Sequence, residues 1–273
     1  MSEIRLLALD LDGTLIAAKD LRVSENVKAA IARARDRGVA ITLVTGRMFE
    51  AALPFAEAIG IDGPIVCYQG AATYRVGTRE RLAHVPVPIA LGRRIFRRAR
   101  VDGVRALGYL DDRLYSEADD AYTRWYTDLA GVRAHIVPSL EELFAKQSST
   151  KINCVLEAER AAAYADEVRA SVGSAAYVTR SNPEYVEVLS PDVDKGRALA
   201  LVASSYGTTL EATMAIGDSW NDIPLLAAAG LGVAMGSSPP ELLAAADATV
   251  GSVEDDGVAE AIDRFLIAGG GAR

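Results

Sequence analysis

The chain has 273 residues, of which 50% are hydrophobic and 24% are charged, and its formal net charge is −8. This length suits one large domain or two of ordinary size, and the composition is that of a soluble globular protein with a substantial core. The negative charge argues against nucleic acid or an acidic membrane surface as the main partner. We also expect no membrane span, because glycines and prolines interrupt the longest charge-free run, residues 223–240.

The cysteines and the N-terminal region indicate a cytoplasmic protein. Cys67 and Cys154 lie far apart in apolar stretches and do not form a metal-binding spacing, so we expect two buried, reduced thiols. Charged residues interrupt the only region that could act as a secretion signal. The sequence gives no indication of the oligomeric state.

The first apolar run, residues 4–9, predicts a buried strand that leads directly into Asp10, Asp12 and Gly13. Side chains alternate along a strand, so both aspartates are expected on one side of its carboxyl end, where open α/β sheets bind ligands. Two carboxylates so placed suit a nucleophile beside an acid/base group, or a site for a hard metal ion. An ordinary boundary between a strand and a turn is the alternative interpretation.

The next segments alternate between helix and strand. Ser24 is a typical helix cap, and helical spacing of apolar residues continues to Gly38. A second buried strand, residues 39–44, ends in Thr45-Gly46-Arg47, and after another helix a third strand, residues 64–68, leads into Gln69. Strands separated by helices predict a parallel sheet with helices on both faces.

The pattern changes near His84, where short strands, turns and helices predict an inserted α+β domain over residues 83–188, between core segments 1–82 and 189–273. We expect its helices to cover one face of a small sheet and the arginines of its first helix to lie in solvent. The predicted helices and strands of this insert are residues 89–100, 122–129, 152–156, 158–172, 177–179 and 185–189.

After the insert, helix and strand alternate again. A helix is predicted from Asp194-Lys195-Gly196 to Tyr206, and a strand over residues 213–216 ends in the polar run Gly217–Asp222. Further strands are expected at residues 231–235 and near Val250, followed by a last helix near residues 258–266. Four strand ends therefore carry polar residues that a buried sheet does not need, which favours a functional site over chance.

These four motifs, DLDGT at residue 10, TGR at residue 45, DKG at residue 194 and GDSWND at residue 217, resemble those of the haloacid dehalogenase (HAD) phosphatase superfamily. Their order, with an insert between the second and third, is similar to the Cof-type branch, which carries a large α/β (type IIB) cap. The resemblance covers the whole chain and implies a Rossmann-like, doubly wound parallel sheet with an inserted α+β cap. The chain departs from the pattern at Gln69, where such proteins usually have Asn.

The resemblance implies that Asp10 attacks phosphorus and forms an aspartyl-phosphate, while Asp12 serves as acid and then as base. It further implies a magnesium ion bound by the Asp10 side chain, the Asp12 backbone carbonyl and Asp218. Asp222 would bind the ion directly, bind it through water, or hold Lys195. These three roles stay open at the level of sequence.

The phosphoryl group would be neutralised by Lys195 and hydrogen-bonded by the Thr45 hydroxyl and the Gly46 amide. Asn221 is also assigned to the phosphate site. The candidate substrate contacts are Arg47, Gln69, Arg180 and Asn182, the last two because they belong to a polar, turn-like break between two apolar strands of the cap.

We therefore expect a cytoplasmic, Mg²⁺-dependent phosphatase of small phosphorylated metabolites, such as sugar phosphates, flavin mononucleotide or pyridoxal phosphate. Asp12 favours a phosphatase, because dehalogenases of the superfamily lack this second aspartate and ion-pumping ATPases have lysine there. The alternatives are a phosphomutase or phosphotransferase, which passes the phosphoryl group to an acceptor other than water, and a catalytically silent binding protein.

Overall fold

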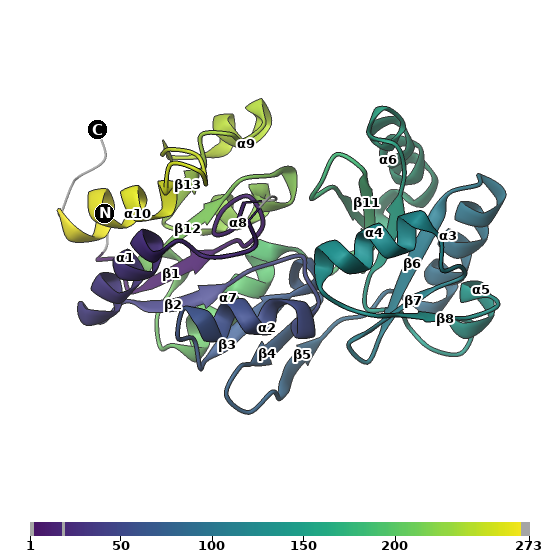
Figure 1. Ribbon diagram of the computed structural model, residues 1–273, viewed down its shortest axis with the longest axis horizontal. Helices are drawn as coiled ribbons and strands as arrows, with labels where there is room; N and C mark the ends of the chain where they lie inside the picture. The colour runs from purple at the N-terminus through teal and green to yellow at the C-terminus, as the bar shows by residue number, and fades with distance from the viewer. Residues whose placement is uncertain (1–2, 18–19, 269–273) are drawn as a thin grey trace. The chain divides into compact units, whose positions relative to one another are not determined.

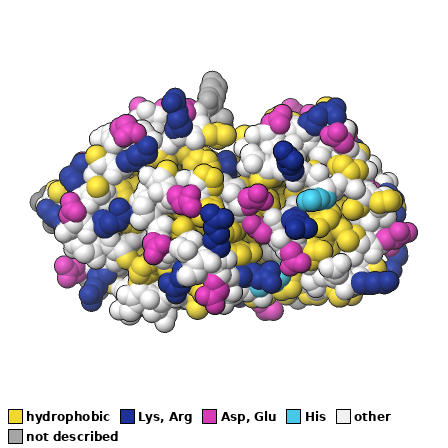
Figure 2. All heavy atoms as spheres, turned by 60° about the horizontal axis from the view of Figure 1, so that its bottom comes forward, with side chains coloured by type: hydrophobic (Ala, Val, Ile, Leu, Met, Phe, Trp, Pro, Cys, Tyr) yellow, Lys and Arg dark blue, Asp and Glu magenta, His cyan; other side chains and the backbone are white. Residues whose placement is uncertain are grey.

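The computed structural model describes residues 3–17 and 20–268, which divide into two compact units. Unit 1 comprises residues 1–46, 52–82 and 194–273, and unit 2 comprises residues 47–51 and 83–193. No helix of the described residues is both long enough and apolar enough to cross a membrane. Figure 2 shows basic and acidic side chains interspersed with apolar ones over the face in view.

Unit 1 is built on a five-stranded sheet in the order β14-β13-β12-β1-β2, in which all neighbouring strands are parallel (Figure 1). Strand β1 pairs with β12 on one side, Leu6 opposite Thr213, and with β2 on the other, Leu6 opposite Ala40. The strands are β1 (Leu6–Leu9), β2 (Ala40–Leu43), β12 (Thr213–Gly217), β13 (Leu231–Ala234) and β14 (Ala248–Thr249).

Helices cover both faces of this sheet. Leu6 and Ala8 belong to a buried cluster with apolar residues of α7, α8 and α9. The alternate residues Leu7 and Leu9 are equally buried and project from the other face, and on that side α1 packs against β2 and α10. The helices of this unit are α1 (Glu25–Asp36), α2 (Phe49–Ala58), α7 (Lys195–Ser205), α8 (Ile223–Ala228), α9 (Pro240–Ala245) and α10 (Gly257–Ile262), the last continuing as a π-helical turn (Asp263–Ile267).

The predicted parallel α/β core with helices on both faces is confirmed, and the Ser24 cap is present, since its side chain accepts a hydrogen bond from the Val27 amide. One feature was not predicted. The third strand, β3 (Pro64–Cys67), joins the main sheet through a parallel bridge between Val44 and Val66, and it also begins an antiparallel sheet with β4 (Ala72–Arg75) and β5 (Arg81–His84). The residues between β3 and β4 form the 3₁₀ turn η1 (Tyr68–Gly70), so the expected strand ends one residue early.

Unit 2 contains a six-stranded sheet in the order β10-β11-β9-β6-β7-β8, antiparallel except for β7 and β8. Val186 and Val188 face a buried cluster formed with α3, α5 and α6. The elements of this unit are α3 (Ile89–Val101), β6 (Arg105–Leu110), β7 (Arg113–Ser116), α4 (Ala121–Ala130), β8 (Ala134–Ile136), α5 (Leu140–Leu143), β9 (Ile152–Val155), α6 (Ala158–Val172), β10 (Tyr177–Thr179) and β11 (Tyr185–Leu189).

Two expectations for this unit are corrected. The helices do not all share one face, because Trp125 and Tyr126 of α4 pack against Tyr185, whose side chain projects opposite to Val186. The arginines of α3 are not all in solvent, because Arg98 is half-buried and pairs with Asp102 at 3.1 Å. A partly apolar helix face can hold the stem of an arginine while its guanidinium reaches a carboxylate at the edge.

Candidate active site

The strand order of unit 1 changes direction at its centre, and this places two aspartates side by side. From β1 the chain moves through β2 to one edge of the sheet, and from β12 it moves through β13 to the other. Because β1 and β12 are parallel neighbours in register at Leu9 and Ile216, Asp10 and Asp218 emerge together at their carboxyl ends. Such a reversal point is where open α/β sheets bind ligands.

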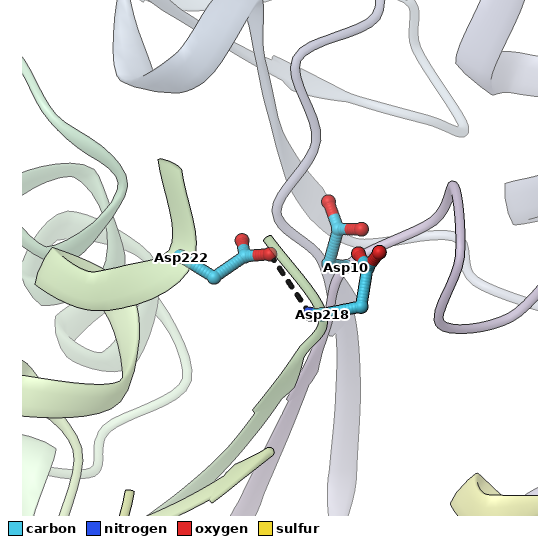
Figure 3. Close-up of side chains that lie close together, drawn as sticks. All are labelled: Asp10, Asp218 and Asp222. Carbon is cyan, nitrogen blue, oxygen red and sulfur yellow. Dashed lines mark hydrogen bonds between the residues drawn. The ribbon is translucent and has the colours of Figure 1, made fainter. Parts of the chain in front are cut away.

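A third aspartate completes a cluster at this point. Asp10, Asp218 and Asp222 each offer a carboxylate oxygen, and these oxygens lie within 4.8 Å of one another. Figure 3 shows the Asp10 and Asp218 carboxylates side by side, with Asp222 pointing toward them from the adjoining 3₁₀ turn η4 (Trp220–Asp222). Oxygen ligands at this spacing fit a hard divalent cation.

The protein environment makes the negative charge of this cluster costly. Burial raises the pKa of Asp10 to about 7, and the charge of Asp222 adds to the rise while Lys195 opposes it. Burial also holds the pKa of Asp218 well above its usual range, and the charges of Asp10 and Asp222 raise it further. The cluster therefore lacks positive charge, and a bound cation would lower the free energy of its ionised carboxylates.

Lys195 places a positive charge of the protein itself next to this cluster. Its side chain is fully buried, and its Nζ lies 2.5 Å from Oδ1 of Asp10 and 2.5 Å from Oδ1 of Asp222. Burial alone would lower the pKa of Lys195, but the charges of Asp10 and Asp222 outweigh burial and hold the pKa above its usual range. The placement comes from a helix cap, because the Asp194 side chain accepts from the Arg197 amide and starts α7 at Lys195.

Asp222 uses both carboxylate oxygens within the protein. Oδ1 receives Lys195, while Oδ2 accepts from the backbone amides of Asp218 at 3.1 Å and Ser219 at 3.2 Å. Ser219 and Asp222 also form a reciprocal capping box at the start of η4. The contact with Lys195 corresponds to one of the three roles left open by the sequence, and the Asp222 carboxylate also belongs to the cluster that could hold a metal ion.

Gly13 allows the loop after Asp10 to approach Asp218. Its φ is +80°, and a Cβ at this position would lie 2.1 Å from Oδ2 of Asp218. Any other residue would therefore clash with the cluster and adopt an unfavourable backbone conformation. Asp12 is exposed, unlike the buried Asp10, and lies outside the set of three clustered carboxylates.

The second motif joins the same edge of the sheet through backbone hydrogen bonds. The Thr45 amide donates to the Val66 carbonyl at 2.9 Å, and the Gln69 amide donates to the Thr45 carbonyl at 3.0 Å. The Gln69 side chain then accepts from Nδ2 of Asn221 at 3.0 Å. Sequence reasoning missed this contact between Gln69 and Asn221, because the two residues are 152 positions apart and no pattern relates them.

Three expected substrate contacts belong to unit 2, namely Arg47, Arg180 and Asn182. Arg180 donates from Nη2 to the Pro183 carbonyl at 2.9 Å, and Oδ1 of Asn182 accepts from the Glu184 amide at 3.2 Å. The turn between β10 and β11 is thus ordered by its own side chains.

A family profile and individual relatives both match nearly the whole of this chain. Residues 7–262 match the family profile of haloacid dehalogenase-like hydrolases. The pyridoxal phosphate phosphatase YbhA of Escherichia coli is 27% identical, covering 96% of this chain and 99% of that protein. A phosphoglycolate phosphatase of Methanothermobacter thermautotrophicus is 29% identical over 96% of this chain and 99% of its own length.

Among solved structures, the HAD subclass IIB sugar phosphatase BT4131 superposes with a TM-score of 0.85, covering 96% of this chain and 99% of that one. Its sequence identity is 21%, so this likeness concerns the fold alone. It agrees with the Cof-type arrangement expected from the motifs.

Replacing Lys195 with methionine tests its place in the cluster. The change removes the internal cation and leaves two buried carboxylates without it, so we expect a loss of about 3–5 kcal/mol in the free energy of unfolding. Urea unfolding in the presence of a chelator measures this loss. Arg197→Met on the same helix is the matched control and should cost below about 1 kcal/mol, because the Arg197 side chain, which pairs with Asp194, is exposed. A Lys195→Met protein as stable as wild type would contradict the charge balance described above.

Proposed function

The chain belongs to the haloacid dehalogenase-like hydrolase family, and from this premise we propose that it is a Mg²⁺-dependent phosphatase of small phosphorylated metabolites that works through an aspartyl-phosphate. The observation that carries the proposal is the buried Lys195 bridging Asp10 and Asp222 beside Asp218, at the reversal point of the sheet. A carboxylate nucleophile next to a fixed cation is what attack on an anionic phosphoryl group requires.

A divalent cation fits the residues present. The three clustered aspartates carry more negative charge than Lys195 balances, and burial raises the pKa values of Asp10 and Asp218. Asp10 and Asp218 are the side chains that would hold Mg²⁺, together with the Asp12 backbone carbonyl by resemblance to the family. Asp222, which also bonds to Lys195 and the η4 backbone, would bind the ion directly or through water. When bound, Mg²⁺ would neutralise charge on the phosphoryl oxygens and keep the dianion near the carboxylates.

The proposed reaction has two steps. A carboxylate oxygen of Asp10 attacks phosphorus, the bond from phosphorus to the ester oxygen breaks, and Asp12 gives its proton to the departing alkoxide. Asp12 then takes a proton from a water molecule that attacks the phosphorus of the aspartyl-phosphate, which releases inorganic phosphate and regenerates Asp10. The exposed position of Asp12 suits a group that must exchange protons with a leaving group and with water.

The substrate class follows from the family and from the relatives. We infer a small phosphomonoester, because the relatives named above act on pyridoxal phosphate and phosphoglycolate. In this proposal the insert, residues 83–188, selects the leaving group as a cap, and Thr45 and Gly46 bind the phosphoryl oxygens. A screen of phosphorylated metabolites for released phosphate tests the proposal, and a panel without turnover in the presence of Mg²⁺ would oppose it.

Replacing the nucleophile and its neighbour separates their roles. Asp10→Asn should reduce phosphatase activity by several orders of magnitude, because no covalent intermediate can form. Asp12→Asn should still release the first product from an aryl phosphate, which needs little protonation of its leaving group, in a burst followed by slow turnover. Stopped-flow measurement of phenolate release distinguishes the two variants, and near-normal turnover by Asp10→Asn would show that the mechanism is wrong.

Metal exchange gives a separate prediction. Activity should disappear when the protein is treated with a chelator and return with Mg²⁺, while Ca²⁺ should support it poorly. Calcium has a larger and more flexible coordination sphere that invites bidentate carboxylate binding, which would occupy the attacking oxygen of Asp10. Phosphate release after dialysis and metal addition is the measurement, and full activity in the exhaustively chelated protein is the result that would exclude the metal requirement.

Arg180 is the best candidate in the cap for binding the leaving group, because a guanidinium fixed in a turn binds anions better than one on a mobile helix face. Arg180→Ala should raise the Michaelis constant for the physiological substrate and leave that for a small aryl phosphate nearly unchanged. Arg94→Ala, on the exposed face of α3, is the control. An equal rise in the Michaelis constant for both substrates would instead indicate that Arg180 supports the fold or the phosphate site. An unchanged Michaelis constant for both would show that Arg180 is a solvated residue without a role in substrate binding.

A further inference from the structure

Gln69 occupies an unusual backbone conformation at the edge of the site. Tyr68 and Gln69 have φ values of 54° and 59°, in the left-handed region that residues with a Cβ rarely adopt, and Gly70 follows at 106°. Both side chains are fully buried. Conformations of this kind persist where the surrounding contacts determine them, and they are common at functional sites.

The η1 turn that contains Gln69 contacts three of the four motif loops. Its backbone is bonded to the second motif, since the Gln69 amide donates a hydrogen bond to the Thr45 carbonyl. A Cβ on Gly70 would lie 2.4 Å from the carbonyl oxygen of Asp194, so the turn packs directly on the residue that starts the Lys195 helix. The Gln69 side chain reaches the fourth motif through Asn221.

The Gln69 carboxamide lies between two of these loops. Its Oε1 accepts from Nδ2 of Asn221 at 3.0 Å, and its Nε2 lies so close to Gly46 that a Cβ there would be 2.3 Å away. Glycine at position 46 therefore makes room for Gln69. The hydrogen bond orients the Asn221 side chain, and the close packing limits where the Gly46 backbone can lie.

The orientation of Asn221 has a chemical consequence. With Nδ2 donating to Gln69, the buried Oδ1 of Asn221 has no hydrogen-bond partner among the described residues. Buried polar atoms without partners are rare and usually await a ligand or an ordered water. Oδ1 is an acceptor, so it would bind a donor such as a water molecule. A phosphate oxygen is itself an acceptor and would instead be bound by the second N–H of Nδ2, since a carboxamide nitrogen carries two donors.

We propose that Gln69 is a positioning residue that holds the Thr45-Gly46 loop and Asn221 in register for phosphate binding. The proposal rests on the phosphatase function proposed above. Gln69 would not contact the substrate itself, because its side chain is fully buried between Gly46 and Asn221. Its effect on phosphate therefore passes through Asn221 and the Gly46 backbone.

Gln69→Asn separates this role from a contribution to folding. Asparagine adopts the left-handed region more readily than glutamine, which offsets part of the stability lost with the buried hydrogen bond, so we expect only a small fall in melting temperature. Its side chain is one methylene shorter and should not reach Asn221. We expect the affinity for inorganic phosphate, measured by calorimetry in MgCl₂, to fall by about tenfold or more.

The control is Gln147→Asn, the same substitution at an exposed position of unit 2, which should change neither quantity. A double-mutant cycle with Asn221→Ala tests the path of the effect. Because part of the effect of Gln69 passes through Asn221, the double variant should lose less phosphate affinity than the product of the two single losses. Phosphate affinity within twofold of wild type in Gln69→Asn, or losses in the double variant that multiply as independent effects, would each overturn the proposal.

The calorimetric readout also keeps this proposal distinct from the phosphatase proposal. Turnover of an aryl phosphate by the wild-type protein tests the phosphatase function alone. If wild type binds phosphate but hydrolyses no phosphomonoester, the phosphatase proposal fails while the role of Gln69 is still decided by the affinity of its variant. If wild type binds no phosphate in MgCl₂, the role of Gln69 in phosphate binding is overturned as well.

Discussion

The constraint on which this structure depends is the burial of one lysine among carboxylates. Lys195 is fully buried with its ammonium group in contact with Asp10 and Asp222. Placing an ammonium ion in a protein interior costs several kcal/mol, and only well-placed opposite charges offset this cost. The helix cap at Asp194, the capping box at Ser219 and the parallel pairing of β1 with β12 all serve to hold these charges in contact.

The same arrangement leaves the charge of the site unbalanced. Three carboxylates and one lysine leave excess negative charge, and burial together with this charge raises the pKa values of Asp10 and Asp218. A bound divalent cation would supply the positive charge that the protein alone lacks, and so allow an anionic phosphoryl group to approach the carboxylates. The lack of positive charge in this one set of side chains thus links the stability of the protein with the proposed binding of a metal ion and of the substrate.

Local features of the fold could be predicted from the sequence because their causes are local. Ser24 starts α1 through its own side chain, and the helix over residues 158–172 follows from its apolar spacing. The polar residues at strand ends also identified the site, since Asp10 and Asp218 have no structural reason to follow buried strands. Topology then brought them together, because strands flanking a reversal point share one edge of the sheet.

Features that depend on distant contacts could not be predicted. The left-handed backbone at Tyr68 and Gln69 has no sequence signal, because neither residue is one that favours this region. The strands β4 and β5 lack a distinctive pattern, and the contact of α4 with Tyr185 depends on packing rather than periodicity. The Gln69–Asn221 hydrogen bond exists only once four loops have assembled.

The most direct test of the central claim is to identify the atom that carries the phosphoryl group during turnover. The wild-type protein would be mixed with a phosphomonoester and Mg²⁺, quenched in acid, reduced with borohydride and analysed by peptide mass spectrometry. The account predicts conversion of Asp10, and no other aspartate, to homoserine, since borohydride reduces an acyl phosphate but not a free carboxylate. Release of phosphate with Asp10 unmodified under the same conditions would contradict it.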